Sequence, residues 1–239
     1  MAHFYFAILV TIIGLFGKKG FVQLHQQGLS MSVEEPTINK SLKYLALGDS
    51  YTIGESVSSS ARYPVQLVNL LRSEGLAFEE PEILATTGWT SGDLLSAMNS
   101  CRFHPPYKLV TLLIGVNNQY QSGDLSAYAI EFRIMLKKAI ELAGGKASHV
   151  IVLSIPDYAY APFAKGSDTA SISRLIDEFN KINRKITDEC KGGYLDITLE
   201  TRKMDESLLA GDGLHYSGKE YAIWAKMLLP KVKDVLSNG

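Results

Sequence analysis

The sequence predicts an α/β fold in which helices cover both faces of a mainly parallel β-sheet. From about residue 42 onward, short apolar runs alternate with longer amphipathic segments. The short runs are continuously apolar, which is typical of parallel strands that are buried on both faces. A strand–helix series of this kind, with no internal repeat and no low-complexity linker, favours a single α/β domain.

Five short apolar runs are the predicted strands. They span residues 43–47, 82–85, 109–114, 150–154 and 194–197. In open parallel sheets the functional site lies at the carboxyl ends of the strands. Polar motifs at residues 48–50, 115–117 and 156–157 directly follow predicted strands, so we expect them to converge at that edge.

Amphipathic segments between and after these runs are the predicted helices. They span residues 63–74, 126–143, 171–190 and 217 to about 236. Apolar residues recur in each at helical spacing. Gly144 and Gly145 form a helix stop after the second segment, and Ser217 stands where it can cap the last one.

Composition excludes some classes of function. The chain has 239 residues, 46% of them apolar, and a formal net charge of −1. Basic and acidic residues are interspersed without a long basic run, which argues against nucleic acid as a partner. Cys101 and Cys190 form neither a C-x-x-C pair nor a disulfide framework, so we expect two core thiols, with a single bridge as the alternative in an exported protein.

The N-terminal segment is expected to lie outside the globular fold. Residues 4–16 are almost unbrokenly apolar and are followed by Lys18 and Lys19. This stretch is shorter than the roughly 20 residues of a spanning helix, but long enough for the apolar part of a secretory signal. No Lys or Arg precedes it and no clear A-x-A cleavage site follows. We therefore separate an extension, residues 1–41, from a globular domain, residues 42–239. As a signal or anchor, the extension would place the protein outside the cytoplasm or on a membrane; otherwise we expect a cytoplasmic protein.

A candidate nucleophile and base stand in two short motifs. Ser50 ends Gly-Asp-Ser after the first predicted strand, and a serine hydroxyl attacks only when a base takes its proton. His215 is the candidate base, because Asp212 lies three residues earlier and a carboxylate there can accept from Nδ1 and fix the tautomer. Taken alone, each motif is equally an ordinary turn.

Candidate oxyanion donors come from two further motifs and from the nucleophile itself. Gly92 lies in T-S-G-D and Asn117 in G-V-N-N. The backbone N–H groups of Ser50 and Gly92, with the side-chain amide of Asn117, would form a three-donor hole for a tetrahedral intermediate. Each such donor is worth roughly 3–4 kcal/mol when it is removed.

These motifs, in this order, resemble the four sequence blocks of the SGNH hydrolases, also called the GDSL-type esterase/lipase family. The resemblance spans about residues 43–230. It implies a flavodoxin-like three-layer α/β/α fold with about five parallel strands. It also implies a serine hydrolase in which Ser50 is the nucleophile, Asp212 and His215 complete the triad, and Gly92 and Asn117 complete the oxyanion hole.

The sequence departs from the family pattern at two positions near these groups. Tyr51 follows the block serine where Leu is usual, and Asn118 follows Asn117 where Asp is usual. Both changes leave the nucleophile and the donors in place and would reshape the pocket. We expect Tyr51, Trp89, Asn118 and Tyr158 to contact substrate.

The substrate class stays open at this stage. An apolar wall suits a small acyl ester or a lysophospholipid-type ester, whereas Tyr and Trp side chains equally suit an acetylated sugar. An acyltransferase on the same fold is a further alternative, and a non-catalytic binding module a remote one. We expect an ester as the small-molecule or lipid partner, and membrane association only through the N-terminal segment.

We expect no cofactor and no metal. Cys101-x-x-His104 is a lone pair without further metal-ligand spacing. Glycine-rich phosphate loops of the Walker or Rossmann type do not occur in the sequence.

Overall fold

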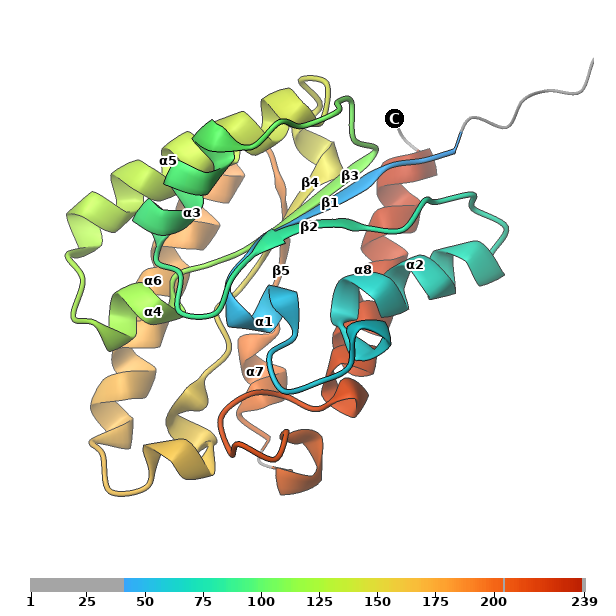
Figure 1. Ribbon diagram of the computed structural model, residues 1–239. Helices are drawn as coiled ribbons and strands as arrows, with labels where there is room; N and C mark the ends of the chain where they lie inside the picture. The colour runs from blue at the N-terminus through green and yellow to red at the C-terminus, as the bar shows by residue number, and fades with distance from the viewer. Residues whose placement is uncertain (1–40, 204, 238–239) are drawn as a thin grey trace, which may run out of the picture. The chain divides into compact units, whose positions relative to one another are not determined.

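A computed structural model gives the structure of the protein and describes residues 41–203 and 205–237 (Figure 1). The predicted N-terminal extension, apart from Ser41, lies outside the described residues, as does its apolar stretch. Within residues 41–203 and 205–237, no helix has both the length and the apolar character that a membrane span requires.

The sheet has five strands, all parallel, in the order β2-β1-β3-β4-β5. The strands are β1 (Tyr44–Gly48), β2 (Glu82–Ala85), β3 (Leu109–Leu113), β4 (Val150–Leu153) and β5 (Gly193–Leu195). Gly48 is in register with Ala85 on one side and Leu113 on the other, so three strands end side by side. The predicted α/β fold and flavodoxin-like strand order are confirmed.

Helices form a layer on each face of this sheet (Figure 1). One layer contains α2 (Tyr63–Ser73) and α8 (Gly218–Ser237), which pack against each other. The other contains α3 (Ser91–Ser100), α5 (Leu125–Leu142) and α6 (Thr169–Glu189). Short helices at the sheet edge are α1 (Ser50–Ile53), α4 (Val116–Tyr120) and α7 (Thr198–Thr201). Single 3₁₀ turns are η1 (Ser59–Ala61), η2 (Ala147–His149), η3 (Tyr158–Tyr160), η4 (Pro162–Ala164) and η5 (Glu206–Leu208).

The predicted long helices α2, α5, α6 and α8 are present within two residues of their expected ends. Helix α3 was missed, because its sequence is rich in Ser, Gly, Asp and Asn and has few apolar residues. A capping box starts it: the Thr90 hydroxyl accepts from the Asp93 N–H, and the Asp93 carboxylate accepts from the Thr90 N–H. The expected cap at Ser217 does not form, since its hydroxyl is buried without a hydrogen-bond partner.

Aromatic side chains fill the core between the sheet and the α2–α8 layer. Trp224 of α8 packs against the rings of Tyr51, Tyr63, Tyr216 and Tyr221 at centroid distances of 5.1–6.3 Å. Burying such rings dominates core energetics, and the tilted and edge-on geometry adds to it. This cluster supports α1 and the start of α8 from behind. Both cysteines are free and only half-buried, so the expectation of two core thiols was wrong.

Candidate functional site

A cavity of about 160 Å³ lies at the carboxyl edge of the sheet, where residues from distant parts of the chain meet. It is lined by Ser50, Tyr51, Thr87, Gly88, Val116, Asn117, Tyr120, Tyr158, Phe163, Leu214 and His215. The expected convergence of the motifs after β1 and β3 with the motif before α8 is therefore present.

Ser50 is the first residue of α1, directly after β1. The Asp49 carboxylate accepts from the Tyr51 N–H at 3.1 Å, and the Asp49 carbonyl accepts from the N–H groups of Thr52 and Ile53. This turn holds the Ser50 side chain at the end of the strand. Ser50 is only 4% exposed, so a reaction partner reaches it through the cavity.

Burial of the Asp49 carboxyl raises its pKa from 3.8 to about 7, although it accepts from backbone N–H groups. No cationic side chain offsets the loss of hydration there, so the charged form is disfavoured. The Asp49 carboxyl, next to Ser50 in the chain, therefore retains its proton to a higher pH than an ordinary aspartate does.

Asp212 and His215 form one compact turn. His215 Nδ1 lies 2.7 Å from one Asp212 carboxylate oxygen, while the other oxygen accepts from the N–H groups of Leu214 and His215 at 3.0 and 2.9 Å. The Ser56 hydroxyl donates to Asp212 across 2.5 Å. The carboxylate is thereby fixed on several sides, and the imidazole keeps one orientation.

These contacts control the ionisation of Asp212. Partial burial opposes its charge, but the hydrogen bonds from Ser56, Leu214 and His215 outweigh that effect and hold its pKa well below the ordinary value. Asp212 is therefore a fixed negative charge beside the imidazole throughout the neutral range.

Tyr51 follows the candidate nucleophile in the sequence, and its ring packs against the ring of His215. The two rings meet edge-on, at 5.7 Å between centroids and 60° between planes. Tyr51 in turn contacts Tyr216 and Trp224, so the aromatic core extends to the imidazole. Tyr51 also lines the cavity, which is consistent with its expected contact with substrate.

Asn117 reaches the cavity from the first turn of α4. Its side-chain Nδ2 donates to the Trp89 carbonyl at 2.9 Å, which fixes the amide and leaves its second N–H available. Gly115, before the helix, has φ +126°, and a Cβ there would stand 2.5 Å from the Tyr128 hydroxyl. Only glycine fits this turn, which sends the chain from β3 into α4.

Gly92 does not reach the cavity, contrary to expectation. The capping box at Thr90 starts α3 so early that Gly92 lies in its first turn, beside the Glu131 carboxylate. Gly88, four residues earlier, lines the cavity instead with φ +84°. The missed signal is the T-x-x-D capping pattern, which assigns Gly92 to a helix and leaves Gly88 as the glycine of the loop.

Two expected substrate contacts have other partners. Asn118 accepts from the Ser91 N–H at 2.8 Å and donates to the Ser91 hydroxyl at 2.7 Å, so it joins α4 to the start of α3. Trp89 packs against the core and contributes its carbonyl to Asn117. Neither side chain lines the cavity. Both side chains therefore position residues next to the cavity without facing it.

Tyr158 does line the cavity and belongs to an aromatic cluster at one wall. Its ring contacts Tyr120 and Phe163 at centroid distances of 6.2 and 6.3 Å, and those two rings contact each other at 6.1 Å. Tyr120 is 59% exposed and Phe163 47%, whereas Tyr158 is buried. The cluster thus runs from the interior of the cavity to solvent, a route that an apolar or planar group can follow.

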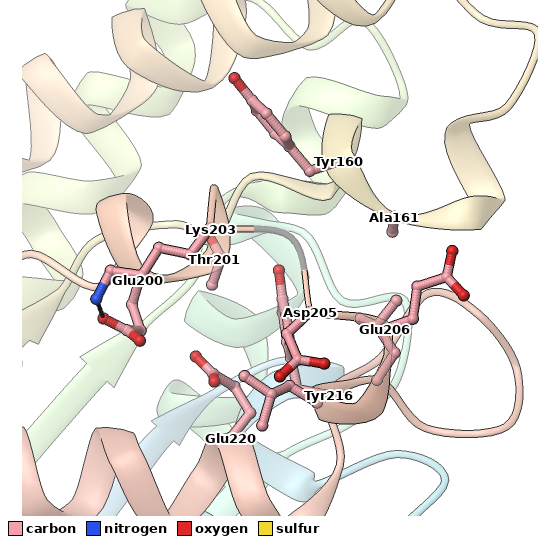
Figure 2. Close-up of a pocket in the computed structure, with 11 residues that line it drawn as sticks. Tyr160, Ala161, Glu200, Thr201, Lys203, Asp205, Glu206, Tyr216 and Glu220 are labelled. Atoms are coloured by element: carbon pink, nitrogen blue, oxygen red, sulfur yellow. Dashed lines mark hydrogen bonds and ion pairs between the residues drawn. The ribbon is translucent and has the colours of Figure 1, made fainter.

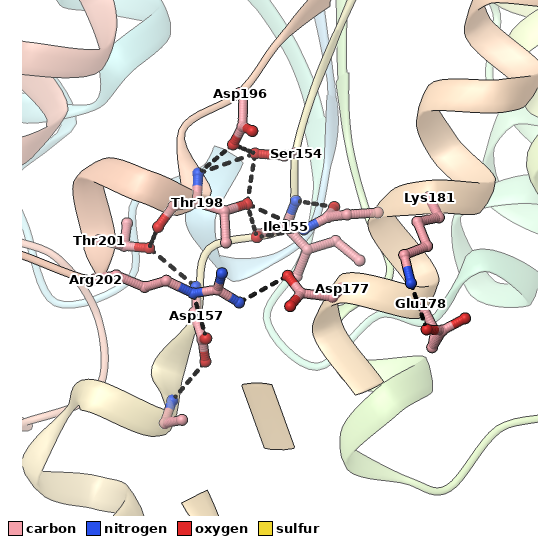
Figure 3. Close-up of polar contacts among 12 residues, drawn as sticks. Ser154, Ile155, Asp157, Asp177, Glu178, Lys181, Asp196, Thr198, Thr201 and Arg202 are labelled. Carbon is pink, nitrogen blue, oxygen red and sulfur yellow. Dashed lines mark hydrogen bonds and ion pairs between the residues drawn. The ribbon is translucent and has the colours of Figure 1, made fainter. Parts of the chain in front are cut away.

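A buried polar network anchors the segment that contains Tyr158 (Figure 3). The fully buried Asp157 carboxylate accepts from Arg202 at 2.8 Å and from the Ala159 N–H at 3.0 Å. Arg202 also pairs with Asp177 at 2.7 Å, and the Thr201 hydroxyl accepts from the Asp157 N–H. These bonds join the loop after β4 to α7 and α6, so they determine where the Tyr158 ring lies.

Among the described residues, no group of three or more His, Cys, Asp or Glu side chains is placed to hold a metal ion. The cavity itself presents hydroxyl, imidazole, amide and backbone N–H groups.

The sequence matches the model of the GDSL-like lipase/acylhydrolase family over residues 46–223, which is most of the chain. The chain belongs to this family. The resemblance inferred from the motifs is confirmed. Comparison with curated protein sequences finds no match.

Several solved structures have the same fold. TesA has a TM-score of 0.64 at 18% identity, covering 81% of this chain and 99% of its own. The esterase EstA from Pseudoalteromonas sp. has a TM-score of 0.63 at 15% identity, covering 82% and 98%. The acetylxylan esterase Axe2 from Geobacillus stearothermophilus has a TM-score of 0.61 at 19% identity, covering 80% and 94%. At these identities the likeness establishes the fold.

Proposed function

We propose that this GDSL-like protein is a serine esterase that cleaves carboxylic esters with small acyl groups through an acyl-enzyme. The supporting observation is that Ser50 and His215 line one cavity, while His215 Nδ1 bonds to the ionised Asp212. Nδ1 of the imidazole donates to the carboxylate, so Nε2 is the nitrogen that is free to accept a proton.

In the proposed reaction, Ser50 Oγ attacks the ester carbonyl carbon and its proton passes to His215 Nε2. The tetrahedral intermediate collapses, the bond to the alkoxy oxygen breaks, and His215 returns the proton to the leaving alcohol. Water then attacks the acyl-enzyme with the same proton transfers, which releases the carboxylic acid and restores Ser50. Asp212 stabilises the imidazolium in both halves of the cycle.

The developing oxyanion needs preorganised donors. We assign this role to the Ser50 N–H, the Gly88 N–H and Asn117 Nδ2, with Gly88 in place of the glycine expected from the sequence. The assignment rests on the three residues that line the cavity around the nucleophile. Donors of this kind do not reorganise during the reaction, which is the source of their large effect on rate.

The size and lining of the cavity favour small acyl groups. Its volume of about 160 Å³ is below the roughly 300–1,000 Å³ of sites for drug-sized ligands. The exposed rings of Tyr120 and Phe163 favour a leaving group that is apolar or ring-shaped. An acetylated sugar is the second candidate, because the same rings could stack on a pyranose, and one structural neighbour is named an acetylxylan esterase.

Hydrolysis of p-nitrophenyl acetate and butyrate by the full-length chain tests the proposal. We expect Ser50→Ala and His215→Ala to lower kcat by at least about 10³-fold while circular dichroism stays unchanged. Ser59→Ala, at an exposed serine of η1, is the matched control and should retain the wild-type rate. Equal activity of wild type and Ser50→Ala would disprove the serine-esterase proposal.

A second measurement compares substrate classes. Acyl lengths from acetyl to palmitoyl, lysophospholipids and acetylated xylo-oligosaccharides are assayed with and without an added acceptor alcohol. We expect acetyl and butyryl esters to give the highest kcat/KM. A maximum at palmitoyl would contradict the small-acyl assignment, and an ester product with the acceptor would identify an acyltransferase.

A further inference from the structure

A second cavity is lined by the end of η3, by the segment from α7 to η5 and by the start of α8 (Figure 2). It is smaller, about 30 Å³, and is lined by Tyr160, Ala161, Glu200, Thr201, Lys203, Asp205, Glu206, Leu208, Leu209, Tyr216 and Glu220. It contains neither Ser50 nor His215 and plays no part in the proposed hydrolysis.

Carboxylates outnumber cations around this cavity. Glu200, Asp205, Glu206 and Glu220 all line it, and the basic side chain among the lining residues, Lys203, is already paired with Glu200. The Asp205 carboxylate accepts from the Ser207 N–H at 2.9 Å and adds its negative charge to the lining of the cavity. A cationic group entering here would meet an excess of negative charge.

Glu220 distinguishes this cavity from an ordinary acidic patch. Glu220 is 1% exposed, and one of its carboxylate oxygens accepts from Trp224 Nε1 at 2.6 Å. The other oxygen, Oε2, is buried and has no hydrogen-bond partner. In Figure 2 the side chains of Glu220 and Asp205 extend into the space between α8 and the segment after α7.

The backbone N–H that a glutamate at the third position of a helix usually bonds to has another partner here. Ser217-x-x-Glu220 has the pattern of a capping box, in which the glutamate would accept from the Ser217 N–H. That N–H donates instead to the Leu208 carbonyl at 2.7 Å, and the Ser217 hydroxyl is also unpaired. Glu220 is therefore directed away from the helix start. Burial raises the pKa of the Glu220 carboxyl, although the hydrogen bond from Trp224 and the charge of Lys203 act against that shift.

An unpaired buried carboxylate oxygen is costly, and a hydrogen-bond donor with positive charge would offset that cost. A metal ion does not fit, since the described carboxylates here are not grouped as metal ligands. The volume suits one small group, and Leu208 and Leu209 supply apolar lining beside the carboxylates. These features suit an alkylammonium ion.

We propose that this cavity binds a small primary alkylammonium ion, whose ammonium group donates to Glu220 Oε2 and whose alkyl stem lies along Leu208 and Leu209. Asp205 and Glu206 at the rim attract the charge. The site is distinct from the esterase cavity, so its occupation is measured independently of hydrolysis.

The test uses the indole N–H of Trp224 as a reporter, because that group donates directly to Glu220. The chain has two tryptophans, so Trp224→Phe assigns the two indole cross-peaks in a ¹H–¹⁵N spectrum of the full-length protein. Titration with butylammonium chloride should shift the Trp224 peak saturably and leave the Trp89 peak in place. Butanol and sodium chloride at equal concentrations should shift neither.

Glu220→Gln keeps an acceptor for Trp224 and removes the charge, so we expect butylammonium binding to weaken by at least about tenfold. Asp205→Asn, at the rim, should weaken it less, and gives a second test if Glu220→Gln does not fold. Glu178→Gln, an exposed carboxylate change on α6, is the control. No saturable shift with the wild type, or equal binding by Glu220→Gln and wild type, would overturn the proposal.

Discussion

Two cavities flank the segment from Asp205 to Tyr216, and they treat buried charge differently. On the side of Ser50, the Asp212 carboxylate accepts from Ser56, Leu214 and His215, and its pKa is lowered. On the other side, Glu220 has one hydrogen-bonded oxygen and one unpaired oxygen, and its pKa is raised. The same short segment thus separates a satisfied carboxylate from an unsatisfied one.

This difference between the two carboxylates shows how local hydrogen bonds preorganise a site. Most bonds to Asp212 come from residues two or three positions away, so the turn orients His215 without any ligand. Glu220 points away from the local partner that its sequence pattern offers. Local hydrogen bonds therefore hold the Asp212–His215 pair in its catalytic geometry. The unpaired oxygen of Glu220 carries a desolvation cost instead, and a ligand that donates a hydrogen bond to it would offset that cost.

The largest expected effect on kcat comes from replacing the hydrogen-bonded Asp212 carboxylate. Asp212→Asn keeps an acceptor for the backbone N–H groups, but its amide cannot accept from His215 Nδ1 as the carboxylate does. The wrong tautomer is then favoured, and we expect kcat to fall by about 10³–10⁴-fold. Asp188→Asn, an exposed change on α6, should have no effect on the p-nitrophenyl butyrate rate. A loss below tenfold for Asp212→Asn would show that the turn does not orient the base.

Two adjacent asparagines separate contact with substrate from support of the wall. Asn117 lines the cavity, whereas Asn118 bonds to Ser91. We expect Asn117→Ala to lower kcat by about 10²–10³-fold with little change in KM. Asn118→Ala should mainly lower the urea midpoint of unfolding. If the two variants lose kcat equally, Asn117 has no special role as a donor.

The position of the segment that contains Tyr158 depends on Arg202. Arg202→Met would leave the fully buried Asp157 carboxylate without a cation, and we expect a loss of about 3 kcal/mol in the free energy of unfolding, measured with urea. The preference among acyl lengths should also change, because Tyr158 follows Asp157. The double variant with Asp157→Asn should recover part of the stability. No recovery would mean that the ion pair is not the cause.

The two glycines after β2 give a matched pair. Gly88 has φ +84° and lines the cavity, whereas Gly92 lies in a helix where a Cβ would stand 3.4 Å from Glu131. We expect Gly88→Ala to lower kcat/KM by about tenfold, because alanine disfavours this backbone conformation and the donor moves. Gly92→Ala should be nearly neutral in the same assay. The reverse order would restore Gly92 as the donor.

The pH dependence of stability should have opposite signs for the two kinds of carboxylate. Asp212 has a lowered pKa when folded, so its contribution is present at neutral pH and is lost as pH falls below about 3.8. Asp49 and Glu220 have raised pKa values, so their contributions are lost as pH rises, for Asp49 between about pH 4 and pH 7.

Glu220→Gln and Asp49→Asn remove that loss. Asp49→Asn should therefore raise the free energy of unfolding at pH 8 relative to pH 5 by about 1 kcal/mol or more, compared with the wild type, and Glu220→Gln should change it in the same direction. Urea unfolding at the two pH values measures it. An unchanged difference in both variants would show that these carboxyls are solvated when the protein is folded.

Much of the fold was predictable because the apolar pattern of each strand matches its burial in the folded sheet. The runs before Gly48 and Gly115 are apolar on both faces, and only a covered parallel sheet accommodates that. The strand ends then placed Ser50 and Asn117 at one edge. The pairing of Asp212 with His215 was predictable because three residues separate them within one turn.

The rest of the site depends on features that the apolar pattern does not encode. Gly92 and Asn118 were expected to act in the site, yet Gly92 lies in the first turn of α3 and Asn118 bonds to Ser91 at the start of that helix. The role of Arg202 comes from its tertiary contact with Asp157, and that of Glu220 from the cavity where the start of α8 meets the segment after α7. The position of Gly88 could have been predicted from the sequence, because the capping pattern at Thr90 marks the start of α3 and leaves Gly88 in the loop before it.

The contact between Ser56 and Asp212 joins residues 156 positions apart, which ties the beginning of the domain to its final loop. A chain that emerges from the ribosome in order presents Ser50 long before it contains Asp212 and His215. Until α8 docks on α2, the proposed nucleophile has no base beside it. Ester hydrolysis should therefore begin only when synthesis is complete, and activity would report the finished fold rather than any partial one.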